Sequence, residues 1–170
     1  MEWLVSLFVL FILLVSLLAG LKEGAVKHFF NLVAVLIAVF IAGLAYHLIA
    51  GLLSFLPGEN WEGFIGFFIT FGIVTAIMHL AFFLPRRIIN KIWKRGLLYR
   101  LLGGALNAVN ASIGLVVFAL MLNAYPIFDW LARWVLGSGI MSSLVSAYGF
   151  IQAMLPPEFQ AAATVVSIIL

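Results

Sequence analysis

Apolar residues run in four long segments along this chain, and short polar or charged stretches separate the segments. The segments cover residues 3–21, 29–55, 64–84 and 101–125. Each is long enough for a helix that crosses a bilayer at about 1.5 Å per residue. No fixed-period repeat or linker divides the chain, so residues 1–170 are expected to form one membrane domain. The pattern predicts an all-α, polytopic membrane protein with four transmembrane helices.

The fourth apolar segment carries small and polar residues at helical spacing. Gly103, Asn107, Asn110 and Gly114 recur every three or four residues and therefore share one face of a helix. Gly104 begins a second small-residue row beside them. Small residues let membrane helices approach closely, and a buried amide can hydrogen-bond across the contact. We therefore predict a central packing helix, with a polar path along Asn107 and Asn110 as the alternative. Phe118 is expected to lie off this face.

The stretch from Arg86 to Arg100 holds six of the nine Lys and Arg residues of the chain. On a helical wheel its isoleucines lie opposite Arg87, Lys91 and Lys94, and this is typical of a short helix in the membrane interface over anionic lipid. The residues expected to contact lipid headgroups are Arg86, Arg87, Lys91, Lys94 and Arg95. Because the stretch lies between two spans, we expect lipid and not nucleic acid as its partner.

The distribution of charge also predicts an orientation. The stretches after the first and third spans, including a short basic hinge at 22–28, hold eight of the nine Lys and Arg, whereas the loop at 57–63 holds none. Basic loops stay on the cytoplasmic side of the inner membrane. Both termini are therefore predicted to lie outside.

The C-terminal segment, 127–170, is expected to be interfacial or periplasmic. Residues 135–155 carry no charge, so a fifth span is one interpretation. However, a row of Ser138, Ser142, Ser146, Gly149 and Gln152 lies opposite an apolar face. This pattern favours a single amphipathic helix that lies on the membrane or re-enters it.

Composition supports the membrane class and offers little chemistry. The chain is 66% apolar and 9% charged, and it has no cysteine, whereas soluble domains are about half apolar and a quarter charged. His47 and His79 lie at different depths of their spans, and His28 is expected to lie at a membrane boundary. The carboxylates fall at or outside the span ends. We predict no catalytic residue, no metal site and no cofactor.

Short motifs carry a resemblance to a known family. Gly20, Lys22 and Gly24 end the first span, Arg100 and Gly103 begin the fourth, and Trp134 with Ser138 follows it. In these residues the chain resembles the colicin V production protein family, CvpA. The family tends to have an Asp and an intramembrane Arg where this chain has Tyr99 and Asn110.

The resemblance implies a four-span bacterial inner-membrane protein without known catalytic activity, linked to colicin V production or export and to envelope integrity. The leading hypothesis is a non-enzymatic protein that acts by self-association, as a homo-oligomer, or by binding a membrane-protein partner. The alternative is a small channel or transporter subunit. A membrane enzyme that acts on lipid is a weaker interpretation, because no catalytic set of residues accompanies it.

Overall fold

The computed structural model describes residues 2–55, 59–92, 96–125 and 129–155, with the side chains of 59, 60 and 129 excepted. The predicted headgroup residues Lys94 and Arg95 lie outside the described residues. Within these ranges the chain is helical and contains no strand. Four of the helices are long and apolar enough to cross a membrane, and they are α1 (Glu2–Glu23), α2 (Ala25–Leu52), α3 (Glu59–Ala81) and α5 (Leu97–Ala124). The prediction of an all-α protein with four spans is confirmed.

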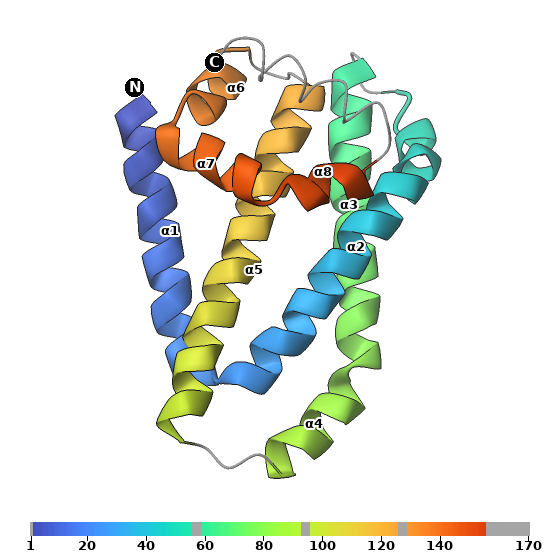
Figure 1. Ribbon diagram of the computed structural model, residues 1–170. Helices are drawn as coiled ribbons and strands as arrows, with labels where there is room; N and C mark the ends of the chain where they lie inside the picture. Colours follow the sequence, from blue (N-terminus) through green and yellow to red (C-terminus); the bar gives the residue numbers. More distant parts are fainter. Residues whose placement is uncertain (1, 56–58, 93–95, 126–128, 156–170) are drawn as a thin grey trace.

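The helices α2 and α5 form the centre of the bundle (Figure 1). α1 packs against α5, α3 packs against α2, and α2 packs against α5. The largest core cluster lies between α2, α3 and α5, where Val39, Phe67, Val116 and Leu120 are buried. Most exposed side chains of α1 and α3 are apolar, as expected of surfaces that face lipid.

α3 does not continue straight through the predicted end at Leu84. It ends at Ala81, and a bend at Phe82 leads into the short helix α4 (Phe83–Ile92). The ring of Pro85 conflicts with the carbonyl group four residues earlier, at Ala81, and proline has no amide hydrogen to donate. The helix therefore breaks before the proline. A short helix is present where the interfacial helix was predicted, but it begins at Phe83 and not at Arg86.

The C-terminal segment is three short helices and not the single helix predicted for 135–155. They are α6 (Asp129–Leu136), α7 (Gly139–Ala147) and α8 (Gly149–Met154). Residues 129–155 therefore contain no fifth span. α7 and α8 run across the bundle near the end where α1 begins (Figure 1), and α7 packs against α5, α1 and α6. The break before α7 occurs at Ser138, which is fully buried and accepts a hydrogen bond from the backbone N–H of Met141.

Two predicted loops are also shorter than expected. The basic hinge at 22–28 is a turn at Gly24 alone, and the loop at 57–63 has become the first turn of α3 from Glu59 onward. Hydropathy places the apolar core of a span but does not show where hydrogen bonding ends, so charged residues can prolong a helix beyond it. α5 likewise begins at Leu97, before the apolar run at 101.

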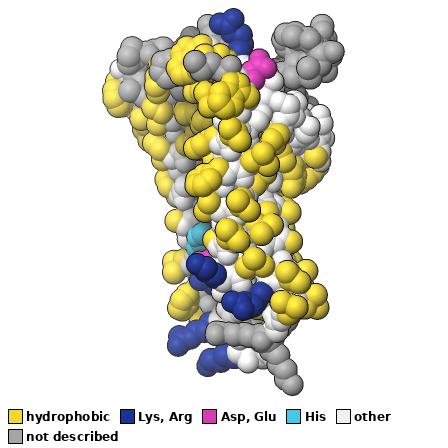
Figure 2. Space-filling model, turned by 90° about the vertical axis from the view of Figure 1, so that its left-hand side faces the viewer, with side chains coloured by type: hydrophobic (Ala, Val, Ile, Leu, Met, Phe, Trp, Pro, Cys, Tyr) yellow, Lys and Arg dark blue, Asp and Glu magenta, His cyan; other side chains and the backbone are white. Residues whose placement is uncertain are grey.

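One end of the molecule is basic. Figure 2, which views the molecule from the α1 side, shows an apolar belt with Lys and Arg side chains gathered below it. The turn between α1 and α2, the helix α4 and the start of α5 all lie at this end (Figure 1). The candidate site is built there.

Candidate functional site

The helices α1 and α5 approach each other backbone to backbone near the basic end. Gly103 of α5 is buried against Gly20 and Gly24. A Cβ atom at Gly103 would lie 2.5 Å from the carbonyl oxygen of Gly20 and 2.7 Å from Cα of Gly24. A Cβ at Gly20 would in turn collide with the carbonyl of Gly103. Only glycine permits this approach, because the neighbouring atoms belong to backbone.

The second small-residue row extends this contact, whereas one predicted member lies outside it. A Cβ at Gly104 would lie 2.9 Å from Cδ2 of Leu21 and 3.1 Å from the carbonyl oxygen of Leu17. Gly114, by contrast, is exposed, and a Cβ there would meet nothing within 4 Å. The packing face of α5 against α1 therefore includes Gly103 and Gly104 but not Gly114.

Both asparagines of α5 hydrogen-bond to the backbone of a neighbouring helix. The amide nitrogen of Asn107 donates to the carbonyl of Ser16 in α1 at 2.6 Å, and that of Asn110 donates to the carbonyl of His28 in α2 at 3.0 Å. Carbonyl groups within a helix already accept the intrahelical bond, so each amide here adds a second bond across helices. These two bonds join α5 to α1 and to α2.

Replacing Asn107 tests the strength of one such bond. Asn107→Leu keeps a branched side chain of similar length but removes the donor to Ser16. Interhelical hydrogen bonds in membranes contribute about 0.6 kcal/mol on average. We expect the melting temperature in detergent to fall by only a few degrees. Loss of the folded protein would instead mean that the amide holds more than this one bond.

The turn at Gly24 brings α1, α2, α4 and α5 together. Gly24 has a φ of 88° and packs against the ring of Tyr99, which is buried. The hydroxyl of Tyr99 donates to Oδ1 of Asn90 in α4 at 2.8 Å. Nε of Arg100 donates to the carbonyl of Leu21 at 3.3 Å, near the C-terminal end of α1. Tyr99 thus joins α5 to the Gly24 turn by packing and to α4 by a hydrogen bond between uncharged groups. It occupies the position where the resemblance leads one to expect an Asp.

His28 is buried at this site, which the sequence did not predict. It was expected at an open membrane boundary, but its side chain is only 2% exposed. Its Nε2 lies 3.0 Å from Oε2 of Glu23, and the other carboxylate oxygen, Oε1, accepts a hydrogen bond from Nζ of Lys27 at 2.6 Å. A signal was present in the sequence, because His28, Val39 and Tyr46 lie eleven and seven residues apart. That spacing places all three on one face of α2, and all three are buried.

The other two histidines do not share a site. Nε2 of His79 lies 3.1 Å from Oδ1 of Asn31, which joins α3 to α2 near the basic end. His47 is exposed, lies near the opposite end of α2 and contacts Tyr46, with the two rings tilted by 37° and their centroids 3.9 Å apart. The expectation that His47 and His79 lie at different depths is confirmed.

The remaining residues singled out in the sequence lie in two separate places. Arg87 and Lys91 are exposed on α4, and Arg86 is half-buried. Ser138, which was predicted on a polar surface row, is instead buried and lies 2.8 Å from the hydroxyl of Ser6 in α1. Trp134 is half-buried and contacts Trp130 edge to face. Ser138 thus ties the α6–α7 turn to the end of α1 that lies far from the glycine contact.

The site lies within a part of the chain that matches a known family. A comparison with protein families matches residues 5–153 to the family described as colicin V production protein. The chain belongs to the colicin V production protein family. The match extends from α1 to α8 and includes the C-terminal short helices. Searches of curated proteins and of solved structures returned no match.

Membership in this family supports a role in colicin V production for a multi-pass membrane protein. The groups gathered at the α1–α5 contact are backbone carbonyls, glycines and amides. These groups hold helices together, and they include no nucleophile beside a base. The chemistry of the contact is therefore that of packing.

Proposed function

We propose that this member of the colicin V production family is a non-enzymatic inner-membrane protein. In this proposal it supports toxin production or export, or envelope homeostasis, by self-association or by binding a membrane-protein partner. The observation that carries the proposal is the backbone-to-backbone contact of Gly20 with Gly103. This contact fixes α1 to α5 closely and supports a rigid bundle that presents its outer surface to other proteins.

The alternative is a channel or transporter subunit with a polar path beside α5. Asn107 and Asn110 would line such a path, but their amide nitrogens donate to the carbonyls of Ser16 and His28. The hydroxyls of Ser142 and Ser143 likewise bond the carbonyl of Gly139, within α7. These local bonds favour the role of a packed scaffold.

Two measurements on the same purified protein separate the two functions. For a scaffold, protein extracted in mild detergent should carry the same membrane-protein partner, or a second copy of itself, in repeated preparations. Liposomes that contain the protein should release entrapped ions no faster than empty liposomes. Release that disappears in Asn107→Leu, with folding intact, would support the channel instead.

The basic end is proposed to face the cytoplasm, and the absence of cysteine makes this directly testable. Single cysteines at positions 59 and 129 should react with a membrane-impermeant thiol reagent in intact spheroplasts, because both positions lie in the half of the molecule that carries few Lys and Arg residues. A cysteine at position 91 should react only after lysis. Reaction at 91 in intact spheroplasts would invert the orientation. In the proposed orientation Arg87 and Lys91 meet the anionic headgroups of the inner leaflet.

A further inference from the structure

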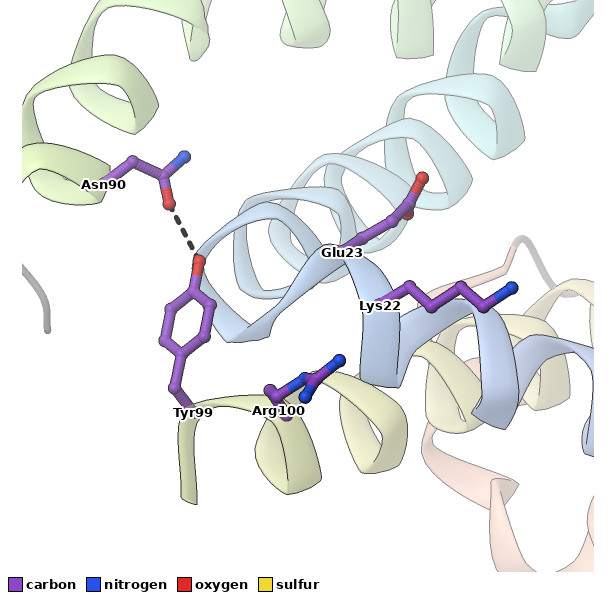
Figure 3. Close-up of a pocket in the computed structure, with 5 residues that line it drawn as sticks. All are labelled: Lys22, Glu23, Asn90, Tyr99 and Arg100. Carbon is purple, nitrogen blue, oxygen red and sulfur yellow. Dashed lines mark hydrogen bonds between the residues drawn. The ribbon is translucent and has the colours of Figure 1, made fainter. Parts of the chain in front are cut away.

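A polar cavity of about 420 Å³ opens at the basic end, where α1, α4 and α5 meet (Figure 3). It is lined by Lys22, Glu23, Asn90, Tyr99 and Arg100. Figure 3 shows the Tyr99 side chain extending from the first turn of α5 toward Asn90 of α4, and the Arg100 side chain extending toward the end of α1, which carries Lys22. The cavity therefore carries two cationic side chains from two different helices.

An apolar cavity of about 320 Å³ lies beside it, between α2, α4 and α5. Its walls include Phe29 and Phe30 of α2, Ile89 of α4, and Leu102 and Leu106 of α5. Phe29 and Leu102 are exposed, so this cavity opens on the outer surface of the bundle, where lipid chains would lie.

The two cavities adjoin. Ile89 and Asn90 are consecutive residues of α4, and each lines one of the two cavities. Tyr99 lines the polar cavity and packs in one cluster with Ala25 and Val26, which line the apolar one. A ligand with a charged head and an apolar chain could therefore place one part in each cavity.

The charge of the polar cavity is suited to an anion. Oε1 of Glu23 bonds Nζ of Lys27 at 2.6 Å, so the one carboxylate of the lining is already paired. Within the described part of the chain, Lys22 and Arg100 form no ion pair. Arg100 donates through Nε to the carbonyl of Leu21, which holds its guanidinium beside the cavity.

We infer that the paired cavities bind one anionic phospholipid, with its phosphate between Lys22 and Arg100 and an acyl chain in the apolar cavity. Arginine and lysine bind phosphate oxygens through charge-assisted hydrogen bonds. Basic pockets between membrane helices on the cytoplasmic side are suited to lipid headgroups. A free phosphate would use only the polar cavity, whereas a phospholipid uses both. This inference does not depend on a role in toxin production.

Native mass spectrometry of the protein in detergent micelles tests the inference. The protein is titrated with phosphatidylglycerol, with phosphatidylcholine and with glycerol phosphate, which has the anion but no chains. We expect phosphatidylglycerol to bind at least about tenfold more tightly than either of the others. Glycerol phosphate lacks the chains that would bury apolar surface in the apolar cavity. Phosphatidylcholine has chains and a phosphate, but its quaternary ammonium cancels the net negative charge that two cationic side chains favour. Equally tight binding of glycerol phosphate would overturn the proposal that the ligand is a lipid. Equally tight binding of phosphatidylcholine would overturn the proposal that the cavity recognises the net negative charge of the lipid.

Substitutions test each cavity separately. Lys22→Gln should weaken phosphatidylglycerol binding about tenfold, whereas Arg133→Gln, which removes an equal charge from an exposed position on α6 at the opposite end of the molecule, should not. Leu102→Trp should weaken binding by filling the apolar cavity, whereas Leu98→Trp, one helical turn away and 71% exposed, should not. Arg100→Gln also removes the bond to Leu21. If Arg100→Gln unfolds, Lys22→Gln alone tests the polar cavity. Unchanged binding in both Lys22→Gln and Leu102→Trp would overturn the inference.

Discussion

Gly103→Leu should prevent α1 and α5 from packing and cause loss of the folded protein in detergent. A Cβ at this position would lie 2.5 Å from the carbonyl oxygen of Gly20 and 2.6 Å from the carbonyl carbon of Gly24. Overpacking of an interior commonly costs about 1–3 kcal/mol when side chains can move aside. Here the neighbours are backbone atoms of another helix, so we expect at least the upper end of that range.

The bilayer does not offset this loss. Separating α1 from α5 exposes apolar side chains to lipid tails, which solvate them as well as another helix does. Once the leucine disrupts the packing between α1 and α5, no hydrophobic effect therefore holds the two helices together. When unfolding is monitored by tryptophan fluorescence, we expect the melting temperature to fall by many degrees. We also expect size-exclusion chromatography to show a shift of the protein to aggregate.

Gly114→Leu provides the matched control. It is the same substitution on the same helix, eleven residues further along, where a Cβ would meet nothing within 4 Å. We expect its melting temperature to stay within a few degrees of the wild type. Equal loss of stability in both variants would show that leucine harms α5 by some route other than the α1 contact.

The sequence predicted the four spans because each needs only a long apolar run, which hydropathy detects directly. It also predicted Gly103 and Asn107 at a packing contact, because their spacing places them on one face. It was wrong to extend that face to Gly114. α1 and α5 are closest at the Gly24 turn, whereas α6 and α7 contribute to the core between them at the other end (Figure 1). A helical wheel gives the face of a helix but not the length over which a partner follows it.

Two aromatic positions show the same limit. Phe118 was expected to lie off the packing face, but it packs in the core with Phe64 and Phe68, at centroid distances of 6.4 and 6.3 Å. Phe118→Leu should therefore remove aromatic contacts with α3. Tyr99 was noted only as a departure from the family pattern, whereas it closes the turn at Gly24. Neither role is visible without knowing which elements meet.

The cavities at the basic end could not be predicted either. Lys22 and Arg100 are 78 positions apart, and each was interpreted as part of a charge bias or motif. They become one site only because the one-residue turn at Gly24 and the kink at Pro85 bring three helix ends together. Such turns are set by single residues and leave little trace in hydropathy.

Gly24→Ala should be the second most damaging substitution, because it strains the turn between α1 and α2. With φ 88° and ψ 168°, Gly24 lies in a backbone region that is essentially restricted to glycine, and a residue with a side chain there costs about 1–3 kcal/mol. The added Cβ would also collide with the ring of Tyr99. Since this turn positions α1 against α5, we expect a clear fall in the melting temperature and weaker phosphatidylglycerol binding.

Gly96→Ala is the control for the backbone. Gly96 precedes α5 as Gly24 precedes α2, and neither makes a side-chain cap, but Gly96 has a φ of −115° and open space around it. Surface substitutions of this kind usually change stability by less than about 0.5 kcal/mol. A large effect at Gly96 would mean that helix capping, and not the turn at Gly24, decides the outcome.

A double-mutant cycle with Tyr99→Ala separates the two contributions at Gly24. Removing the ring should relieve the collision but leave the strain of the positive φ, so Gly24→Ala should cost less in the Tyr99→Ala background than in the wild type. The part that remains should be about 1–3 kcal/mol. If Gly24→Ala costs the same in both backgrounds, the ring of Tyr99 does not press on this turn.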